Sequence, residues 1–295
     1  MILGIDVGGT WVRFGYVDRN KEIRHEARFP MPEVFGSSVA DFADYIENYI
    51  HDCGEKPLAV AIGLPSILDK KKRRVLSTAN IAMLQDIPLA DLLEEKLGIP
   101  CFLNHDVKSL LEFDIDLFGL ETEDTTIIAF YVGTGFGNSV CIDGKYLSGK
   151  NGGAGEVAHM PFPGASGQCG CGNKGCAETV AAGKRLAAIR EEYFPETDFS
   201  ELFIKHKNEA VIEEFISNIA VVIATEVSIF DPDHIILGGG VINMPGFPRE
   251  MLEEKVYHFA RKPLPANNLS YRYTPDGQMN GIIGSAIYAR KQLSK

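Results

Sequence analysis

Residues 2–17 read ILGIDVGGTWVRFGYV: an apolar run, an aspartate, a Gly-Gly-Thr turn and a second strand-like run. Apolar runs on either side of a glycine turn predict two strands joined by a tight hairpin. The tip of such a hairpin presents backbone N–H groups and the Thr10 hydroxyl, which suits a phosphate group. Alone, this pattern is weak evidence, because any tight hairpin can be built from the same residue types.

The same arrangement returns at residues 125–142, TTIIAFYVGTGFGNSVCI. Here an apolar strand at 125–132 and a further strand at 139–142 flank a Gly/Thr turn at 133–137. The recurrence strengthens both motifs and predicts duplicated α/β halves, each presenting a phosphate turn to a shared cleft.

We therefore expect two α/β domains, a number that also suits a chain of 295 residues. A smaller N-terminal domain would cover 1–118, and a larger C-terminal domain would cover 119–280. Small residues at 281, 284, 285 and 286 predict a final helix that packs closely against another element. We expect this helix, 281–295, to return to the first domain.

The composition excludes some function classes. The chain has 40 acidic and 29 basic residues and a net charge of −11, which argues against a nucleic-acid partner. No apolar run reaches the roughly 18 residues that a membrane span needs. Met1 leads straight into the first strand without a secretory signal, so we expect a cytoplasmic protein with no membrane partner.

Residues 152–178, GGAGEVAHMPFPGASGQCGCGNKGCAE, hold three of the six cysteines. One imidazole and three thiolates form a ligand set that a tetrahedral structural Zn²⁺ prefers. The four candidates are His159, Cys169, Cys171 and Cys176. The alternative is disulfides or free thiols, but three cysteines cannot pair among themselves. We expect a zinc clip, and its flanks carry the carboxylates Glu156 and Glu178.

Four further features are less specific than the cysteine motif. Asp106 follows a short strand at 99–103, where it could either line a ligand crevice or cap the next helix. The basic run DKKKRR at 69–74 is interpreted as a solvated hairpin tip. The triple glycine at 238–240 either lets a flat ligand approach the backbone or simply turns the chain from strand to helix. Asn80 lies in a loop from which it could hydrogen-bond a ligand.

Taken together, these motifs resemble the ROK family of sugar kinases, within the actin–hexokinase–Hsp70 superfamily. The resemblance runs the length of the chain. It is most specific in the pattern His-x₉-Cys-x-Cys-x₄-Cys-x-Glu from His159 to Glu178. Gly-Glu-Val-Ala-His at 155–159 is similar to the family's Gly-Glu-x-Gly-His, with Ala158 in place of glycine. The resemblance implies a duplicated actin/hexokinase-like, ribonuclease H-like fold with an inter-domain cleft and a zinc-binding loop.

The resemblance also implies roles for individual residues. Asp106 matches the catalytic aspartate, which accepts the proton of the sugar 6-hydroxyl. Residues implied in sugar binding are Ser66, Asn80, His105, Asp106, Glu156, His159 and Glu178. Residues implied in binding ATP and Mg²⁺ are Asp6, Gly8, Gly9, Thr10, Arg13, Thr134, Gly135, Gly238, Gly239 and Gly240. No Gly-x₄-Gly-Lys-Ser/Thr motif occurs, so a P-loop kinase is excluded.

The sequence gives less specific evidence for which sugar is the acceptor. The family's Glu-Asn-Asp-Ala-Asn is here Asn-His-Asp-Val-Lys at 104–108, so His105 replaces a sugar-binding asparagine. Residues 230–250, FDPDHIILGGGVINMPGFPRE, most resemble the D-allose kinases of the family. We therefore expect D-allose as the acceptor, with glucose or an N-acyl-hexosamine such as N-acetylmannosamine as the alternatives. A sugar-responsive regulator without a DNA-binding domain is a remote alternative, and the family resemblance implies a homodimer.

Overall fold

The structure, a computed structural model, describes residues 1–78 and 81–295. These residues form two units. Unit 1 contains Met1–Leu120, Ser148–Ala154 and Gly277–Lys295, and unit 2 contains Glu121–Leu147 and Gly155–Asp276. The predicted boundaries count residues 148–154 with the second domain, whereas in the structure this short segment packs with unit 1.

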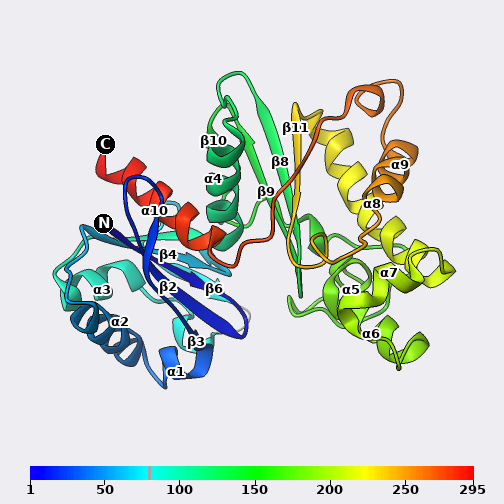
Figure 1. The fold of residues 1–295 in the computed structure, drawn as a ribbon. Coiled ribbons are helices and arrows are strands. Elements are labelled where there is room, and N and C mark those ends of the chain that lie inside the picture. The colour runs from blue at the N-terminus through cyan, green and yellow to red at the C-terminus, as the bar shows by residue number, and fades with distance from the viewer. Residues whose placement is uncertain (79–80) are drawn as a thin grey trace. The chain divides into compact units, whose positions relative to one another are not determined.

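Unit 1 is built on a five-stranded mixed sheet of order β3-β2-β1-β4-β7 (Figure 1). Its strands are β1 (Ile2–Val7), β2 (Trp11–Val17), β3 (Ile23–Pro30), β4 (Ala59–Leu64) and β7 (Cys101–His105). The first three are antiparallel neighbours, while β1, β4 and β7 run parallel. In register, Asp6 pairs with Gly63 and Gly63 with Asn104, so the carboxyl ends of the parallel strands meet at one edge. Ligands bind at such an edge in open α/β sheets.

Helices cover both faces of this sheet. The helical elements of unit 1 are α1 (Met31–Phe35), α2 (Val39–Cys53), η1 (Ala82–Leu84), α3 (Leu89–Leu97), α4 (Asp106–Phe118) and α10 (Asn280–Leu293). One core joins alternate residues of the strands, such as Leu3 and Ile5, to α2 and α3. A smaller core on the other face joins Ile2 and Ala61 to Ile282 of α10. The alternation of apolar residues along β1 thus places them on opposite faces.

Unit 2 repeats the plan with a five-stranded sheet of order β10-β9-β8-β11-β12. Its strands are β8 (Thr126–Val132), β9 (Phe136–Ile142), β10 (Lys145–Tyr146), β11 (His234–Gly238) and β12 (Tyr271–Tyr273). Its helical elements are η2 (Val157–His159), α5 (Glu178–Ala181), α6 (Gly183–Tyr193), η3 (Phe199–Glu201), α7 (Leu202–His206), α8 (Ala210–Phe230), α9 (Arg249–Phe259) and η4 (Ala266–Asn268). Helix α8 is buried along one side against the sheet and α9 (Figure 1).

The two sheets share one topology, which confirms the predicted α/β class. In each, an antiparallel hairpin (β1–β2 or β8–β9) is extended by a third antiparallel strand on one side. Two parallel strands extend it on the other side. The second glycine turn is shorter than predicted, because β9 already begins at Phe136.

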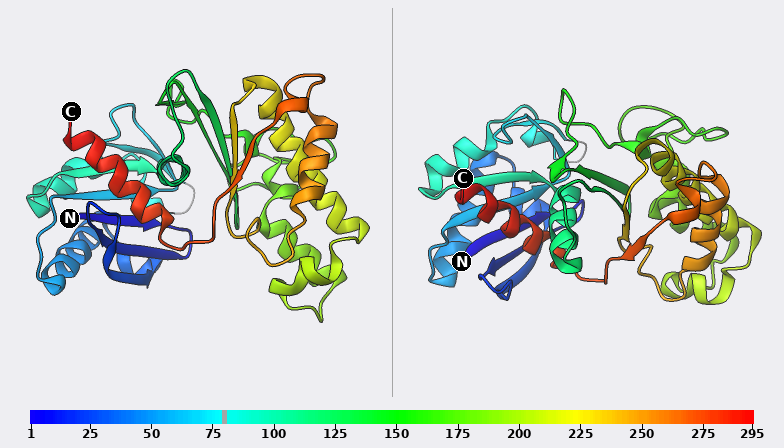
Figure 2. Two further views of the ribbon diagram at one scale, coloured as in Figure 1. Left: turned by 45° about the horizontal axis from the view of Figure 1, so that its top comes forward. Right: turned by 90° about the horizontal axis from the view of Figure 1, so that it is seen from above.

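The last helix, α10, packs against α4, β1 and β4 and is the red helix of unit 1 in Figure 2. Its small residues make this contact possible. A Cβ on Gly284 would lie 1.7 Å from the carbonyl oxygen of Ser109, and one on Gly281 would lie 2.7 Å from the Asp6 carboxylate. The predicted close packing of this helix is therefore confirmed.

In the described ranges 1–78 and 81–295, no helix combines the length and apolarity that crossing a bilayer requires.

Candidate functional site

The first glycine turn joins β1 and β2 and leaves its tip exposed. Gly8 N donates to the carbonyl oxygen of Trp11 at 2.9 Å, which closes the turn. Gly9 and Thr10 at the tip are exposed. An exposed tip suits the phosphate-binding role that the sequence predicts, and the role itself stays a prediction.

Asp6 lies one residue before the end of β1, beside this turn. It pairs in register with Arg13, whose Nη1 lies 3.2 Å from Asp6 Oδ2. Burial raises the pKa of the Asp6 carboxyl to about 6, and the charge of Asp106 adds to this effect. The Arg13 guanidinium opposes the shift by favouring the carboxylate.

Asp106 is the first residue of α4 and directly follows β7. Its Oδ1 accepts a hydrogen bond from Val107 N at 2.8 Å. Burial raises its pKa to about 6, and the Val107 N–H works against the shift. The N-cap of α4 is His105, whose side chain makes no capping hydrogen bond, and the Asp106 carboxylate accepts from the first turn of the helix. Asp106 also lies at the edge where the parallel strands of unit 1 end, so the structure is compatible with both predicted roles.

The other residues of unit 1 with a predicted sugar role are Ser66, His105 and Asn80. Ser66 begins β5 (Ser66–Leu68) and is buried, and its Oγ has no hydrogen-bond partner among the described residues. His105 Nδ1 lies 3.3 Å from Asp106 Oδ1. Asn80 lies outside the described residues.

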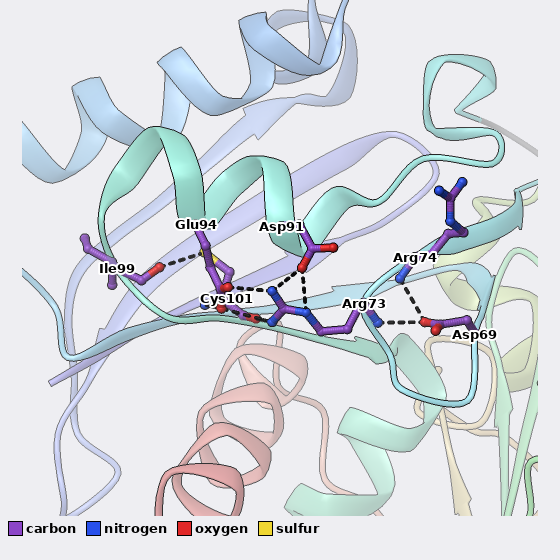
Figure 3. Close-up of polar contacts among 7 residues, drawn as sticks. All are labelled: Asp69, Arg73, Arg74, Asp91, Glu94, Ile99 and Cys101. Carbon is purple, nitrogen blue, oxygen red and sulfur yellow. Dashed lines mark hydrogen bonds and ion pairs between the residues drawn. The ribbon is translucent and has the colours of Figure 1, made fainter.

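The basic run at 69–74 makes more contacts with the rest of unit 1 than the predicted solvated hairpin tip would. It does form the tip of a hairpin between β5 and β6 (Val75–Thr78), but it is not simply solvated. Arg73 pairs with Asp91 and Glu94 of α3 and donates to the carbonyl oxygen of Cys101 at 3.3 Å (Figure 3). The hairpin is therefore tied to a helix and to β7. No local pattern could indicate this, since the partners of Arg73 lie 18 or more residues away.

In unit 2 the second glycine turn is held by the segment that follows the cysteines. Gly183 N donates to the carbonyl oxygen of Gly133 at 2.8 Å, at the start of α6. Glu178 Oε2 accepts from Phe136 N at 3.3 Å. A Cβ on Gly135 would lie 2.8 Å from the same carboxylate oxygen. The structure thus places Glu178 directly against the predicted phosphate turn, and Thr134 at its tip is exposed.

The predicted zinc ligands converge. The ligand atoms of His159, Cys169, Cys171 and Cys176 all lie within 4.8 Å of one another. The Sγ atoms of Cys171 and Cys176 are 3.6 Å apart, and Cys169 Sγ is 3.4 Å from His159 Nδ1. Ligands about 2.0–2.3 Å from one tetrahedral ion are separated by about 3.5–3.8 Å, so these distances fit Zn²⁺.

The thiols themselves also favour a cation. Burial raises the pKa of the Cys169 thiol to about 12. A bound cation is what would keep such a group as a thiolate at neutral pH. The loop around it is tightly wound: a Cβ on Gly175, whose φ is +76°, would lie 2.6 Å from the carbonyl oxygen of Ala165. Zinc binding stays a prediction that the arrangement of ligands fits.

Two carboxylates contact this cluster. In the sequence, Glu156 precedes the four candidate ligands and Glu178 follows them. Glu178 Oε1 accepts from Cys169 Sγ at 3.5 Å, and Glu156 Oε2 lies 3.8 Å from His159 Nε2. The two ring nitrogens of His159 therefore face different groups, with Nδ1 toward the thiols and Nε2 toward Glu156. A ligating histidine is usually fixed by such a contact at its second nitrogen.

The triple glycine follows β11, and only part of it is open. Gly239 has φ +95°, and a Cβ there would lie 2.5 Å from the carbonyl oxygen of Val132. A Cβ on Gly238 would meet the Thr274 hydroxyl at 2.9 Å. Gly240 has no atom within 4 Å of its Cβ position. Packing within unit 2 thus explains the first two glycines, and Gly240 alone is open to a ligand.

Comparison with known proteins agrees with this arrangement. A sequence model described as "ROK family" matches residues 2–292. The chain belongs to the ROK family. Its relatives include the N-acetyl-D-glucosamine kinase of Vibrio cholerae, 29% identical over 97% of this chain and 99% of the relative. The N-acetylmannosamine kinase of Salmonella typhi is 27% identical over 98% of both chains. The ROK hexokinase structure from Thermus thermophilus is 26% identical, with a TM-score of 0.76 over 99% of both chains.

The predicted resemblance to ROK sugar kinases is confirmed at the level of the family. The closeness to D-allose kinases is not shown, since these relatives are named for N-acetylated hexosamines or for hexoses in general. The roles predicted for individual residues stay predictions. In this ROK chain they divide between the units: Asp6, the first turn, Ser66, His105 and Asp106 belong to unit 1. The second turn, the cysteine cluster, Glu156, Glu178 and the triple glycine belong to unit 2.

Proposed function

We propose that this ROK protein is an ATP-dependent kinase that phosphorylates the 6-hydroxyl of an N-acyl-hexosamine. Membership of the family supports the sugar-kinase activity. The observation that carries the proposal within the structure is Asp106, a partly buried carboxylate at the carboxyl ends of the parallel strands. The choice of sugar rests on full-length relatives named for N-acetyl-D-glucosamine and N-acetylmannosamine.

In the proposed reaction, Asp106 accepts the proton of the sugar 6-hydroxyl. The hydroxyl oxygen forms a bond to the γ-phosphorus of ATP, and the bond from that phosphorus to the β–γ bridging oxygen breaks to leave ADP. A carboxylate whose pKa is raised to about 6 is a better proton acceptor than an ordinary aspartate, and it is still ionised at neutral pH. Positioning and charge stabilisation supply most of the acceleration in phosphoryl transfer.

The glycine turns are proposed to hold the nucleotide phosphates. The exposed tips at Thr10 and Thr134 each offer a hydroxyl and backbone N–H groups, which suit phosphate oxygens. Asp6 is a carboxylate beside the first turn and fits an oxygen ligand for Mg²⁺, which prefers such donors. When bound with ATP, Mg²⁺ would neutralise part of the phosphate charge.

The cysteine cluster is proposed to be a structural zinc site. Four protein ligands leave no open position on a tetrahedral ion, so the metal would not itself activate a hydroxyl. It would fix the loop that carries Glu156, His159 and Glu178. These three side chains are the proposed hydrogen-bond partners of sugar hydroxyls, and the contacts of both carboxylates with the cluster support this role.

D-Allose remains the second candidate, because His105 replaces the family's sugar-binding asparagine and lies 3.3 Å from Asp106. A coupled ATP assay decides between the candidates by comparing kcat/KM for N-acetyl-D-glucosamine, N-acetyl-D-mannosamine, D-glucose and D-allose. We expect an N-acetylated sugar to exceed glucose by about 10-fold or more. A higher value for D-allose would overturn the choice of sugar but not the mechanism. Turnover of none of these sugars would overturn the kinase proposal.

A further inference from the structure

A row of charged side chains crosses the first three strands of unit 1, next to the first glycine turn. In the register of the sheet, Asp6 of β1 lies opposite Arg13 of β2, and Arg13 lies opposite Arg28 of β3. Residues directly opposite each other on neighbouring strands present their side chains on the same face of a sheet. One aspartate and two arginines therefore share this face. The predicted nucleotide-binding residues include Asp6 and Arg13 but not Arg28.

The aspartate pairs with only one of the two arginines. Arg13 Nη1 lies 3.2 Å from Asp6 Oδ2, and a Cβ on Gly8 of the turn would lie 3.7 Å from the same nitrogen. Among the residues that the structure describes, Arg28 forms no ion pair. Its hydrogen bond goes from Nη1 to the neutral amide oxygen of Gln278 at 3.4 Å. The charge of Arg28 is therefore less compensated than that of Arg13.

A stacking contact fixes Arg28 beside the turn. The central carbon of its guanidinium lies 4.2 Å from the ring centre of Trp11. Trp11 pairs in register with Pro30, so it lies diagonally from Arg28, and it directly follows Thr10 at the tip of the turn. An arginine that stacks its flat face on an aromatic ring still has the N–H groups at its edge for binding a phosphate. The stack thus orders the side chain without using its hydrogen-bond donors.

The backbone also attaches the end of β3 to the turn. Met31 N, directly after the last residue of β3, donates to the carbonyl oxygen of Thr10 at 2.9 Å. Arg28 is exposed, and so are Gly9 and Thr10. An exposed guanidinium and the exposed tip of the turn are therefore held close together within unit 1.

We infer that Arg28 is a further phosphate-binding residue, which contacts the terminal phosphates of ATP beside the first glycine turn. This inference rests on the proposed kinase function. The N–H groups and the Thr10 hydroxyl of the turn are neutral donors, and Arg28 adds a positive charge. Hydrogen bonds from a guanidinium to phosphate oxygens are about twice as strong as those from neutral donors. The chain has a net charge of −11, so general attraction of polyanions would not bring ATP to this turn.

Titration calorimetry with ATP and with AMP, in the presence of Mg²⁺, compares Arg28→Met with the unaltered chain. Methionine keeps an apolar stem over Trp11 and removes the charge. We expect Kd for ATP to rise about 10-fold, because a charge-assisted hydrogen bond is lost. Kd for AMP should change less than about 2-fold, because AMP lacks the terminal phosphates. Arg28→Lys, which keeps a positive charge, should recover part of the lost affinity.

Arg24→Met is the matched control. Arg24 is an exposed arginine of the same strand, but it pairs with Tyr16, whose side chain belongs to the core on the other face of the sheet. We expect this variant to bind ATP as the unaltered chain does. An equal loss of ATP affinity in Arg24→Met and Arg28→Met would contradict the inference, since net charge alone would then explain it. An equal loss for ATP and AMP in Arg28→Met would also contradict it.

Steady-state kinetics separate binding of phosphate from a structural effect. Arg28→Met should raise KM for ATP about 10-fold and leave KM for the sugar largely unchanged, because the lost contact is made with ATP alone. If KM for both substrates rose together, or if neither changed, Arg28 would only pack on Trp11 and the inference would be wrong.

A further measurement uses the unaltered chain and so does not depend on the folding of a variant. Saturating ATP should protect Arg28 from modification by phenylglyoxal, read by mass spectrometry, and leave the modification of Arg24 unchanged. Equal modification of Arg28 with and without ATP, in a chain that binds and turns over ATP, would overturn the inference and leave the kinase function intact. An unaltered chain that neither binds ATP nor phosphorylates a sugar would overturn both.

Discussion

Asp6 and Asp106 are two carboxylates at one edge of the unit 1 sheet, and each has a raised pKa of about 6. Burial is the main cause for both. Their surroundings then separate them: Asp6 has the Arg13 guanidinium 3.2 Å away, whereas Asp106 accepts from the Val107 N–H and has His105 Nδ1 at 3.3 Å. Carboxylates in different environments usually serve different roles. Asp106 is the better candidate for a proton acceptor, and Asp6 is the better candidate for a cation ligand.

Asp106→Asn should lower kcat by about 10²–10⁴-fold, the usual contribution of a general base, and leave KM for sugar and ATP largely unchanged. In the unaltered protein, kcat/KM should fall as the pH drops below about 6, because Asp106 becomes protonated and cannot accept a proton. Steady-state kinetics across pH 5–9 measure both effects.

The same raised pKa predicts how stability responds. Burial disfavours the ionised form, so the stability that Asp106 contributes is complete below pH 3.8 and is lost as the pH rises through about 6. Asp106→Asn should therefore keep or raise Tm at pH 7.5. Asp116→Asn, on the same helix and paired with Lys21, is the matched control and should retain turnover. An Asp106→Asn enzyme with near-normal kcat would remove this residue as the base.

Part of the candidate site could be predicted because its residues lie close together in the sequence. The zinc ligands and both flanking glutamates fall between 156 and 178, so their spacing indicates their chemistry directly. The contacts of the basic run at 69–74 could not be predicted in this way. Arg73 lies in the hairpin, whereas its partners lie in α3 and β7, and only the folded unit brings them together. The local pattern alone favours a solvated tip.

At the scale of single elements, the 159–178 loop contains little regular structure. We therefore expect its conformation to depend on the metal that its side chains bind. Two isolated bridges, Pro161 with Cys176 and Gln168 with Lys174, are its sheet-like contacts. The buried Cys169 thiol and the exposed Cys171 contribute to the same cluster. A loop of this kind gains its shape mainly from a bound metal.

Cys171→Ser should reduce bound zinc from about one ion per chain to nearly none, because three ligands hold a structural site poorly. We expect the affinity for sugar to fall about 10-fold or more, since the loop carries Glu156, His159 and Glu178. Metal analysis and sugar titration measure the two effects. Cys53→Ser, a thiol of unit 1 outside the cluster, is the control and should change neither. Full sugar affinity in a demonstrably zinc-free protein would contradict the proposed role of the loop.

Helix α10 shows that a small-residue pattern can predict packing without identifying the partner. The pattern at 281–286 indicated close approach, but only the structure shows that Gly284 packs against Ser109 of α4. Elsewhere a single capping residue divides the chain into two helices: α1 and α2 are separated at the N-cap Ser38. The Ser38 side chain accepts from Asp41 N and starts a new helix there.

Gly284→Ala should destabilise the protein by about 1–3 kcal/mol or more, because a Cβ cannot fit 1.7 Å from the Ser109 carbonyl oxygen. Thermal unfolding followed by circular dichroism measures the loss. Gly240→Ala is the matched control, since no atom lies within 4 Å of its Cβ position. Equal Tm values for Gly284→Ala and the unaltered chain would mean that α10 does not pack on α4 in solution as described.

At the scale of the whole molecule, each unit has its own sheet and its own apolar core. The cores of unit 1 draw on β1, β4, α2, α3 and α10, while that of unit 2 draws on β8, β11, α8 and α9. A unit with its own core can unfold as its own cooperative step. The predicted homodimer remains a prediction at this scale, and sedimentation at several protein concentrations would measure it.

Scanning calorimetry should therefore resolve two transitions, and the two perturbations above should act on different ones. Removal of zinc by a chelator should lower the transition of unit 2, because all four ligands belong to it and binding stabilises only the folded form. Gly284→Ala should lower the transition of unit 1, where α10 and α4 both lie. A Tm shift of about 2–4 °C per kcal/mol is expected for units of this size. If both perturbations moved one common transition equally, the units would unfold as a single cooperative body, and their separate cores would not give them separate stabilities.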